Sequence, residues 1–521
     1  MISEDNLKLA RLIPPSTSGD TAVTLESSAE ALSIAKAVQK DVESERALKK
    51  VDPVKHWNFY HGYHTKYFNK RKGEDDTDWA DRKKRGLFAN YIRFVVDLDT
   101  RFLYGRPKKI GRRYGMNDTT EKKLRDINKL ININNLQMES KRSASLYGEQ
   151  GLRLIAVDKR TGSQVTSATK IDDNVYPHPV KLDAQNTFFL TNPYDKVVAV
   201  TMVTEFKDYT DGEKLVVVTE LITDDSRWVW HDDALMSAEV NKYSIRDEFV
   251  LERNNYERID NVQDMLDLQV AFDECLTDNA YFFARHGRPQ LVTEIDLSAV
   301  INKQNFAWKI DPDDEGTKKI LDRIGYLVWD GKMEAAAEHL TNLESKIYKV
   351  SSTAAISTGD LKGIGNLRSG AALVTAHSPS IQKAQEMQII WAENEEMLAK
   401  ALIAFDAKIH NTTVEARFPG FDFEMRFPTD SGVPGDEHMN AEIRQININS
   451  HLKTSADLVA EANPSFSNQE IKDYVEQLVV DSKTQADALR VFETVEAPAK
   501  GSPSGGSSAS KSTEQKKPKS S

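Results

Sequence analysis

Five acidic residues are concentrated in one stretch whose apolar spacing predicts a helix. The acidic residues are Asp264, Asp267, Asp273, Glu274 and Asp278. The helix is predicted from about residue 260 to 285, and its apolar residues recur at three- and four-residue steps: Met265, Leu268, Phe272, Cys275, Leu276 and Phe283. Carboxylates can hold a metal ion, as in a nuclease, or repel phosphates where many copies surround a channel. They can also simply face water.

A glycine-rich stretch, residues 351–370, is the second candidate site and is predicted to be a flexible loop between long helices. Lys362 and Arg368 are its only cations, so they are candidates for transient contact with a nucleic-acid backbone. Four glycines are candidate hinges because glycine adopts conformations that other residues avoid, namely Gly359, Gly363, Gly365 and Gly370. The spacing resembles a phosphate-binding loop only in glycine content, because no strand precedes it.

Other candidate chemistry is weaker. His61 and His64 are three residues apart and could share a metal, but the aromatic residues of 56–64 favour a packing face. The run at 82–85, Arg-Lys-Lys-Arg, indicates a solvated helix end or else a phosphate or subunit contact. The sequence contains no P-loop, zinc-protease or serine-hydrolase motif. We therefore predict no catalytic residue, no bound metal and no cofactor.

Composition restricts the class of protein further. The formal net charge is −11, whereas proteins that bind DNA tightly without sequence preference are usually basic, so any DNA contact should be loose or local. Cys275 is the single cysteine, which excludes an internal disulfide and a cysteine-based zinc site. The sequence has no apolar run of about 18 residues and no signal-peptide pattern at its start, which predicts no membrane span.

The elements that must position these residues predict an α+β fold that is mostly α. Helices are predicted at 26–50 and through most of 56–150, and an antiparallel sheet at 151–255. Three shorter strands are expected at 290–295, 306–310 and 326–329, and another at 421–428. Further helices are expected at 333–350, 371–377, 379–410, 436–450, 454–462 and 467–495. In the helix at 333–350 the apolar residues follow a heptad-like pattern, which favours packing along another helix. Ser378 and Pro379 are read as the N-cap and first residue of the long helix.

Several short motifs, in order, resemble the portal, or head-to-tail connector, proteins of long-tailed bacteriophages. The resemblance covers roughly residues 40–490, and two departures from it are Pro379 within the long helix and the histidines at 61 and 64. The motifs are Tyr60-His-Gly-Tyr-His64, Asn90-Tyr-Ile-Arg-Phe-Val-Val-Asp97 with Phe102-Leu-Tyr-Gly-Arg-Pro107, Tyr147-Gly-Glu149, Asn254-Asn255, and Ser369-Gly-Ala-Ala-Leu373.

The resemblance implies a portal-type architecture between two low-complexity ends. Residues 1–25 are expected to be a flexible leader and residues 497–521 a disordered, lysine-containing tail. Between them the resemblance implies a wing (26–259), a stem helix pair (260–286 and 332–350) that encloses a small α/β clip (287–331), a tunnel loop (351–370), a long, kinked helix returning to the wing (371–435) and a helical crown (436–496).

The resemblance also implies function and partners. It implies a dodecameric ring at one capsid vertex of the virion, assembled in the host cytoplasm, through which double-stranded DNA is packaged and ejected. The implied partners are the terminase large subunit, the major capsid and scaffolding proteins, and the head-completion adaptor. The acidic helix, Lys362 and Arg368 would line the DNA channel, and ATP hydrolysis would belong to the motor. Two alternatives stay open: a nucleic-acid-processing enzyme with a carboxylate-bound metal, and a scaffold or adaptor that forms no ring.

Overall fold

The computed structural model describes most of the chain, and its elements form two compact units. The described residues are 25–105, 110–115, 118–165, 171–192, 196–208, 214–286, 290–293, 324–327, 334–353, 375–427, 454–463, 466 and 468–495. The first unit comprises Met1–Ile446 with Asn463–Ser465, and the second comprises Asn447–Ala462 with Phe466–Ser521. Two expected elements, the helix at 436–450 and the strand at 306–310, lie outside the described residues, as do the leader and the tail.

The N-terminal part of the first unit is helical, as predicted. Its elements are α2 (Leu25–Leu48), α3 (Pro53–Tyr60), the 3-10 helix η1 (His64–Tyr67), α4 (Asp76–Lys84), α5 (Tyr91–Tyr104), α6 (Asp118–Leu130) and α7 (Ile133–Tyr147). Asp52 caps α3 by accepting a hydrogen bond from the Lys55 amide at 3.0 Å, and Asn90 caps α5 in the same way. Gly148 ends α7 with a φ of +85°, a conformation that favours glycine.

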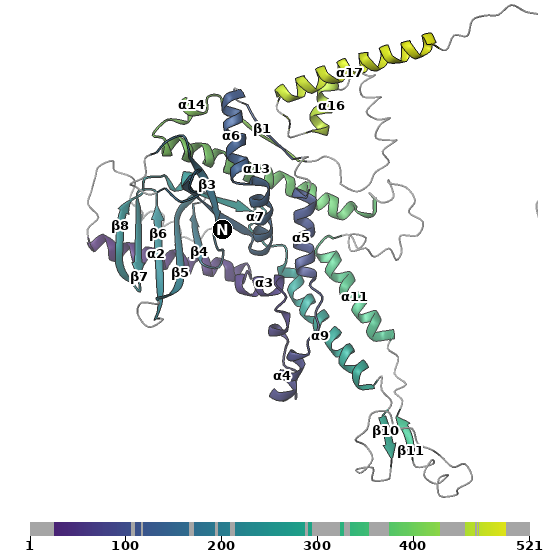
Figure 1. The fold of residues 1–521 in the computed structure, drawn as a ribbon. Coiled ribbons are helices and arrows are strands. Elements are labelled where there is room, and N and C mark those ends of the chain that lie inside the picture. Colours follow the sequence, from purple (N-terminus) through teal and green to yellow (C-terminus); the bar gives the residue numbers. More distant parts are fainter. Residues whose placement is uncertain are drawn as a thin grey trace, which may run out of the picture. The chain divides into compact units, whose positions relative to one another are not determined.

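The predicted antiparallel sheet is present as two separate sheets (Figure 1). A three-stranded sheet has the order β3-β2-β9, with β2 at Glu149–Asp158, β3 at Val175–Lys181 and β9 at Phe249–Arg253. A five-stranded sheet has the order β4-β5-β6-β7-β8, with bounds Thr187–Thr191, Val197–Asp208, Lys214–Thr223, Ser226–His231 and Ala234–Val240. The five strands of this sheet lie in sequence order, and each pairs with the next in antiparallel fashion, as in consecutive hairpins.

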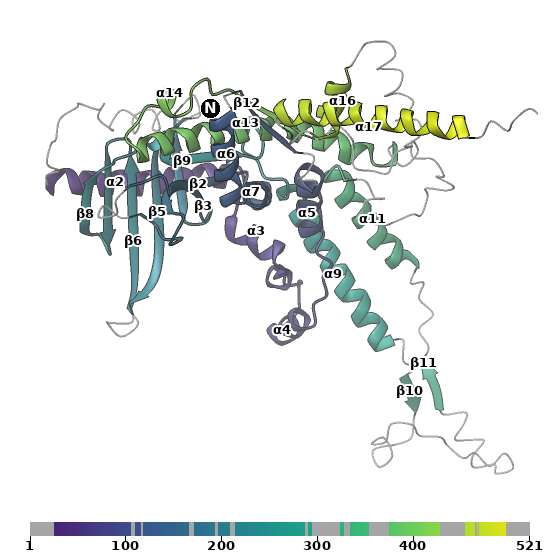
Figure 2. The same cartoon turned by 45° about the horizontal axis from the view of Figure 1, so that its top comes forward.

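Helix α2 covers one face of the five-stranded sheet (Figure 2). Ala31, Ala35, Val38 and Val42 are buried, and their steps of four, three and four place them on one face of the helix. They pack against strand residues that include Trp230, which is 1% exposed. This layer of helix on sheet therefore buries its apolar residues within one chain.

Shorter elements complete the first unit. They are α8 (Ile245–Glu248), α14 (Val414–Arg417), and two antiparallel strand pairs: β1 (Gly111–Tyr114) with β12 (Phe423–Arg426), and β10 (Gln290–Thr293) with β11 (Ile324–Leu327). The strand expected near 421–428 is confirmed as β12. Its partner β1 lies in a region predicted to be mostly helical, and pairing over such a sequence distance leaves no local signal.

Two helices, α9 (Gln263–His286) and α11 (Glu334–Val350), pack side by side, and both views show them adjacent (Figures 1 and 2). Leu343 and Ile347 of α11 are buried in one apolar cluster with Met265, Leu266 and other residues of α9. Both helices occur where the sequence predicted them. The heptad-like seam on α11 therefore has α9 as its partner.

The long helix α13 runs from Ser378 to Ile409 and packs in the core of the first unit, with Trp391 and Phe405 almost fully buried. Residues 375–376 are helical and a turn at His377 separates them from α13. The expectation that Ser378 is the N-cap is wrong by one position, because His377 occupies it and Ser378 is already helical. Pro379 is tolerated within the first turn, where its missing N–H has no partner to lose.

The described part of the second unit consists of two helices. They are α16 (Ser455–Ala462) and α17 (Asn468–Val495), which confirm the helices predicted at 454–462 and 467–495. Val459 and Ala460 of α16 are buried against Ile471 of α17. Among the described residues, no helix combines the length and the apolar character needed to cross a lipid bilayer.

Candidate functional site

The acidic helix α9 starts at a buried cap. Asp260 accepts hydrogen bonds from the amides of Val262 at 2.8 Å and Gln263 at 2.5 Å, which satisfies two N–H groups at the start of the helix. Burial raises the pKa of Asp260, and the nearby His56 opposes that change. The cap fixes where α9 begins, and therefore which of its residues face the protein interior.

Asp273, one of the five acidic residues expected to line a channel, is buried inside the subunit. Its side chain and that of His64 are both 0% exposed, and Oδ2 of Asp273 lies 2.6 Å from Nδ1 of His64. A fully buried carboxylate cannot line an open channel, so the expectation is wrong for this residue. The physical reason is that the buried stripe of α9 includes Leu266, Gln269 and Asp273, which lie three or four residues apart.

The contacts of His64 require a proton between the two side chains. Nε2 of His64 lies 2.7 Å from the carbonyl oxygen of Phe59, which can only accept, so Nε2 must carry hydrogen. The contact from Nδ1 to Asp273 then needs a second proton, held by the ring or by the carboxyl group. Burial raises the pKa of Asp273, while its hydrogen bond to His64 opposes that rise. The pair is thus a buried, proton-sharing link between η1 and α9.

The second oxygen of Asp273 and the neighbouring Gln269 bind the start of α5. Oδ1 of Asp273 accepts from the amide of Ala89 at 3.2 Å and from Nε2 of Gln269 at 2.9 Å. Gln269 also accepts from the amide of Tyr91 and donates to the carbonyl of Ala89. Because these polar groups are buried or partly buried, the bonds fix the register between α9 and residues 87–91.

The three histidines near residue 60 do not converge on one site. Nδ1 of His61 lies 2.9 Å from the carbonyl of Trp57, and Nδ1 of His56 lies 2.8 Å from the carbonyl of Leu146. His64 is taken by Asp273. The packing interpretation therefore describes this stretch better than a shared metal, since each ring bonds a different protein group.

Glu274 and Asp278 also have partners within the subunit. Glu274 accepts from the amide of Asn69 at 2.6 Å and lies 3.6 Å from Arg82, and Asp278 pairs with Arg71. The side chain of Arg82 is 9% exposed and pairs with Glu74. The hydrogen bonds that Glu74 accepts, first from Arg82 and then from the Arg71 amide, lower the pKa of Glu74 to about 2. Arg82 is therefore not solvated, whereas Lys84 and Arg85 of the run at 82–85 are exposed at the end of α4, as expected.

Two acidic residues of α9, Asp264 and Asp267, remain exposed, and no ion pair joins either of them to another described residue. The other predicted site residues lie outside the described part of the chain: Lys362, Arg368, Gly359, Gly363, Gly365 and Gly370. Of the predicted glycine-rich loop, residues 351–353 are described. The structure thus divides the five acidic residues into three with partners and two without.

The residues where the loop begins are anchored by a contact that the sequence analysis missed. Nζ of Lys383, on α13, lies 2.7 Å from Asp99 on α5 and donates to the carbonyl of Ser351 at 2.8 Å. Asn261, just before α9, donates to the same carboxylate at 3.1 Å. The start of α9 and the end of α11 are therefore both tied to α5 through one buried carboxylate, that of Asp99.

A second buried polar group lies between α7 and β9. Lys141 is 0% exposed and donates to Ser145 and to Asn254, each at 2.8 Å, and burial lowers its pKa to about 7. Glu252 is also 0% exposed and accepts from Gln137 at 2.7 Å, and burial raises its pKa to about 8. Asn254 belongs to a motif quoted above, which was the available signal for this network.

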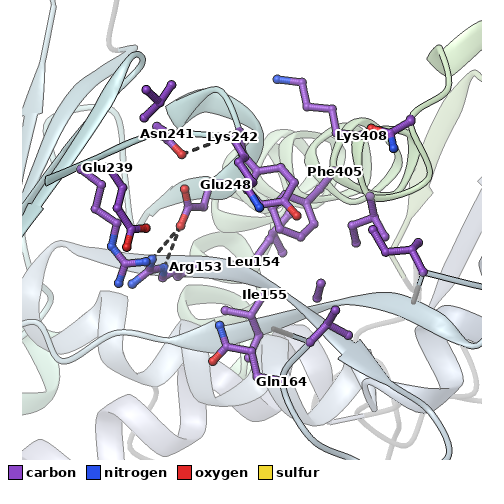
Figure 3. A pocket seen from close by; sticks show the side chains of 18 residues that line it. Arg153, Leu154, Ile155, Gln164, Glu239, Asn241, Lys242, Glu248, Phe405 and Lys408 are labelled. Carbon is purple, nitrogen blue, oxygen red and sulfur yellow. Dashed lines mark hydrogen bonds and ion pairs between the residues drawn. The ribbon is translucent and has the colours of Figure 1, made fainter. Parts of the chain in front are cut away.

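A hollow of about 650 Å³ lies between β2, β8 and α13 (Figure 3). Two of its basic residues have acidic partners: Arg153 pairs with Glu248 at 2.8 Å, and Lys408 pairs with Asp247, which lies beside the hollow, at 2.5 Å. Figure 3 shows the Arg153–Glu248 contact inside the hollow. Since these side chains already have partners, the hollow is better described as a packed joint between sheet and helix than as a ligand site.

A comparison with protein families relates this geometry to known proteins. Residues 56–478 match the family model described as "Phage portal protein, SPP1 Gp6-like". No match was found among the curated proteins. The matched region begins in the segment that packs against α9, includes α9, α11 and α13, and ends within α17. Because it spans most of the 521 residues, the chain belongs to the SPP1 Gp6-like family of phage portal proteins, which are head-to-tail connectors of bacteriophages.

Proposed function

We propose that this portal protein assembles into a ring, dodecameric as the resemblance implies, at one vertex of the capsid. Double-stranded DNA passes through the ring during packaging and ejection, and the protein itself catalyses no reaction. The observation that carries the proposal is the portal match over residues 56–478. The packed pair α9–α11 supports it, because each helix also exposes a face that the described residues leave uncovered.

The proposal assigns partners to the ring. The terminase large subunit docks on it during packaging, and the head-completion adaptor replaces the terminase afterwards. The major capsid and scaffolding proteins surround the ring during assembly in the host cytoplasm. The clip segment, residues 287–331, is proposed to supply the docking surface for the motor and the adaptor.

The proposed channel contacts are made by the glycine-rich loop. Lys362 and Arg368 touch the DNA backbone transiently, and Gly359, Gly363, Gly365 and Gly370 allow the loop to follow the moving duplex. Changing Lys362 and Arg368 together to alanine should reduce packaging while rings still assemble. A loss of solubility would instead show that the two residues are structural.

Imaging the purified full-length protein tests the ring. Negative-stain electron microscopy should show annular particles with a central hole, and two-dimensional averages should give their symmetry. A uniform population of monomers at micromolar concentration would contradict the proposal and favour an adaptor that works as one chain. The metal-dependent nuclease receives no support from α9, because three of its carboxylates bind protein donors.

A further inference from the structure

Near the end where α9 begins and α11 ends, the two helices expose charges of opposite sign, and the acidic residues that α11 exposes, Glu334 and Glu338, lie farther along it. Asp264 and Asp267 are exposed on α9, and Lys346 and Lys349 are exposed on α11. Each pair is three residues apart, so its members lie about one turn apart on the same side of their helix. None of the four has an ion-pair partner within the described residues.

The acidic residues of α9 and the basic residues of α11 both lie on faces that point away from the apolar cluster shared by the two helices. On α9, Met265 and Leu266 are fully buried, and Asp264 and Asp267 lie on the opposite side of the helix. On α11, Leu343, Ile347 and Tyr348 are buried, whereas Lys346 and Lys349 lie on its exposed face. The buried faces of both helices belong to one apolar cluster, which also includes residues of α3 and α5, so the acidic and basic faces point away from that cluster.

The two pairs also lie at the same level along the helices. Asp264 and Val350, the residue after Lys349, line one hollow at the wing end of the pair. The helices run in opposite directions, so Asp267 and Lys346 are each one turn farther from the wing. The order Asp264 then Asp267 therefore matches the order Lys349 then Lys346.

We infer that Asp264 and Asp267 of one subunit bind Lys349 and Lys346 of the α11 helix in the neighbouring copy. This inference rests on the proposed ring. Rotation about a ring axis that runs along the helix pair does not change the height of a residue, so charges at one height in a single subunit meet at that height between neighbours. Such a head-to-tail contact repeats until the ring closes.

The inference changes the role of the two exposed carboxylates. They set the register of neighbouring α9 and α11 helices instead of facing DNA. Exposed ion pairs are weak one at a time, but each subunit of a ring contributes the same contact, and opposed like charges act strongly against a wrong register. Ala271 on α9 and Asn342 on α11, both exposed one turn farther along, leave room for close approach.

Charge reversal on either helix tests the contact. The variants Asp264→Lys/Asp267→Lys and Lys346→Asp/Lys349→Asp are purified as full-length proteins, and mass photometry gives the fraction of subunits in rings. Each variant should assemble at least about tenfold less well than the wild type, because like charges oppose each other at every interface. Circular dichroism should show both variants folded. The control Lys122→Glu/Lys129→Glu reverses two exposed lysines on α6 and should assemble normally.

Mixing the two variants decides whether the contact is between subunits. In an alternating ring every interface pairs lysine with aspartate again, so an equal mixture of the two assembly-deficient variants should form rings. A contact within one subunit could not be restored by mixing. Failure of the mixture to assemble, or normal assembly of either variant alone, overturns the inference.

The outcomes separate this inference from the proposed function. A wild type that never forms rings contradicts the ring itself. Wild-type rings together with unaffected charge-reversed rings contradict the inference alone. If Asp264→Lys/Asp267→Lys rings form normally but retain DNA differently, the two carboxylates face the channel, as the sequence first indicated.

Discussion

The five-stranded sheet and the helix pair α9–α11 bury their apolar residues in different ways. The sheet is covered by α2 within the same chain, and Trp230 lies 1% exposed in the resulting cluster. Residues 64–91 pack against one side of the helix pair. Its exposed faces carry charges that have no ion-pair partner among the described residues. The sheet face under α2 is covered within a single subunit, whereas the helix pair presents complementary charges that a second copy could satisfy. Substitutions in the first region should therefore change stability, and those on the exposed faces of the helix pair should change assembly.

The largest effect on stability is expected at Trp230. Replacing Trp230 with alanine removes a buried aromatic ring between the sheet and α2, and should lower the free energy of unfolding by about 3–5 kcal/mol. Urea denaturation followed by circular dichroism measures this change. Trp57→Ala serves as a control, because Trp57 is 37% exposed. Equal losses from the two substitutions would contradict the description of the sheet core.

A loss of about 3 kcal/mol is expected when Asp273 is replaced by alanine, because the His64 ring keeps a buried polar nitrogen without its partner. The double variant His64→Ala/Asp273→Ala should lose less than the sum of the two single variants. Denaturant titrations of all four proteins measure the coupling. Additive losses would show that the two side chains do not act as a pair.

The pH dependence of stability should reveal Glu252. Its pKa is raised to about 8 in the folded protein, so the folded state binds this proton more tightly than the unfolded state does. Its contribution is full below the unfolded pKa of about 4.5 and is lost as the pH rises through about 8. Glu252→Gln should remove that decline, a change on the order of 2 kcal/mol between pH 5 and pH 8. Midpoints of urea unfolding across this range measure it, and an unchanged slope would contradict the assignment.

Lys141 should act in the opposite direction. Burial lowers its pKa to about 7, so the unfolded state holds this proton more tightly. Stability should therefore rise between about pH 7 and pH 10, over which the unfolded lysine keeps its charge. Lys141→Met should flatten that rise in the same urea experiment. A rise that persists in the variant would assign it to another group.

The smallest effect on stability is expected on the exposed face of α11. Lys349→Ala should change the free energy of unfolding of the unassembled subunit by less than about 0.5 kcal/mol, because an exposed lysine without a partner stabilises little. Thermal unfolding at concentrations below assembly measures it. A larger loss would show that Lys349 has a role within the subunit and would sharpen the contrast with the sheet core.

Local patterns predicted much of this fold. Steps of three and four residues indicated α9, α11 and α13, and short β-branched or aromatic runs separated by turn residues indicated the strands that form the two sheets. The Asn254-Asn255 motif pointed to a position that proves to be a buried hydrogen-bond partner of Lys141. Periodicity works for these elements because each buries one continuous face.

The partners of the acidic residues could not be predicted in the same way. His64 and Asp273 are 209 positions apart, and no local pattern joins them. The sequence analysis placed every carboxylate of α9 on a polar face, whereas Asp273 lies in the buried stripe beside Gln269 and Thr277. Three polar residues at steps of four within one helix were the available signal for a buried polar contact.

The anchor at Lys383 has a mechanical consequence. The ammonium group of Lys383 bonds both the carbonyl oxygen of Ser351, the residue that follows α11, and the carboxylate of Asp99 on α5. A force applied along α11 is therefore transmitted to α5 through this short, largely buried contact instead of through flexible backbone. We expect that link to resist both tension and added salt, because ions screen a buried charge pair far less than an exposed one.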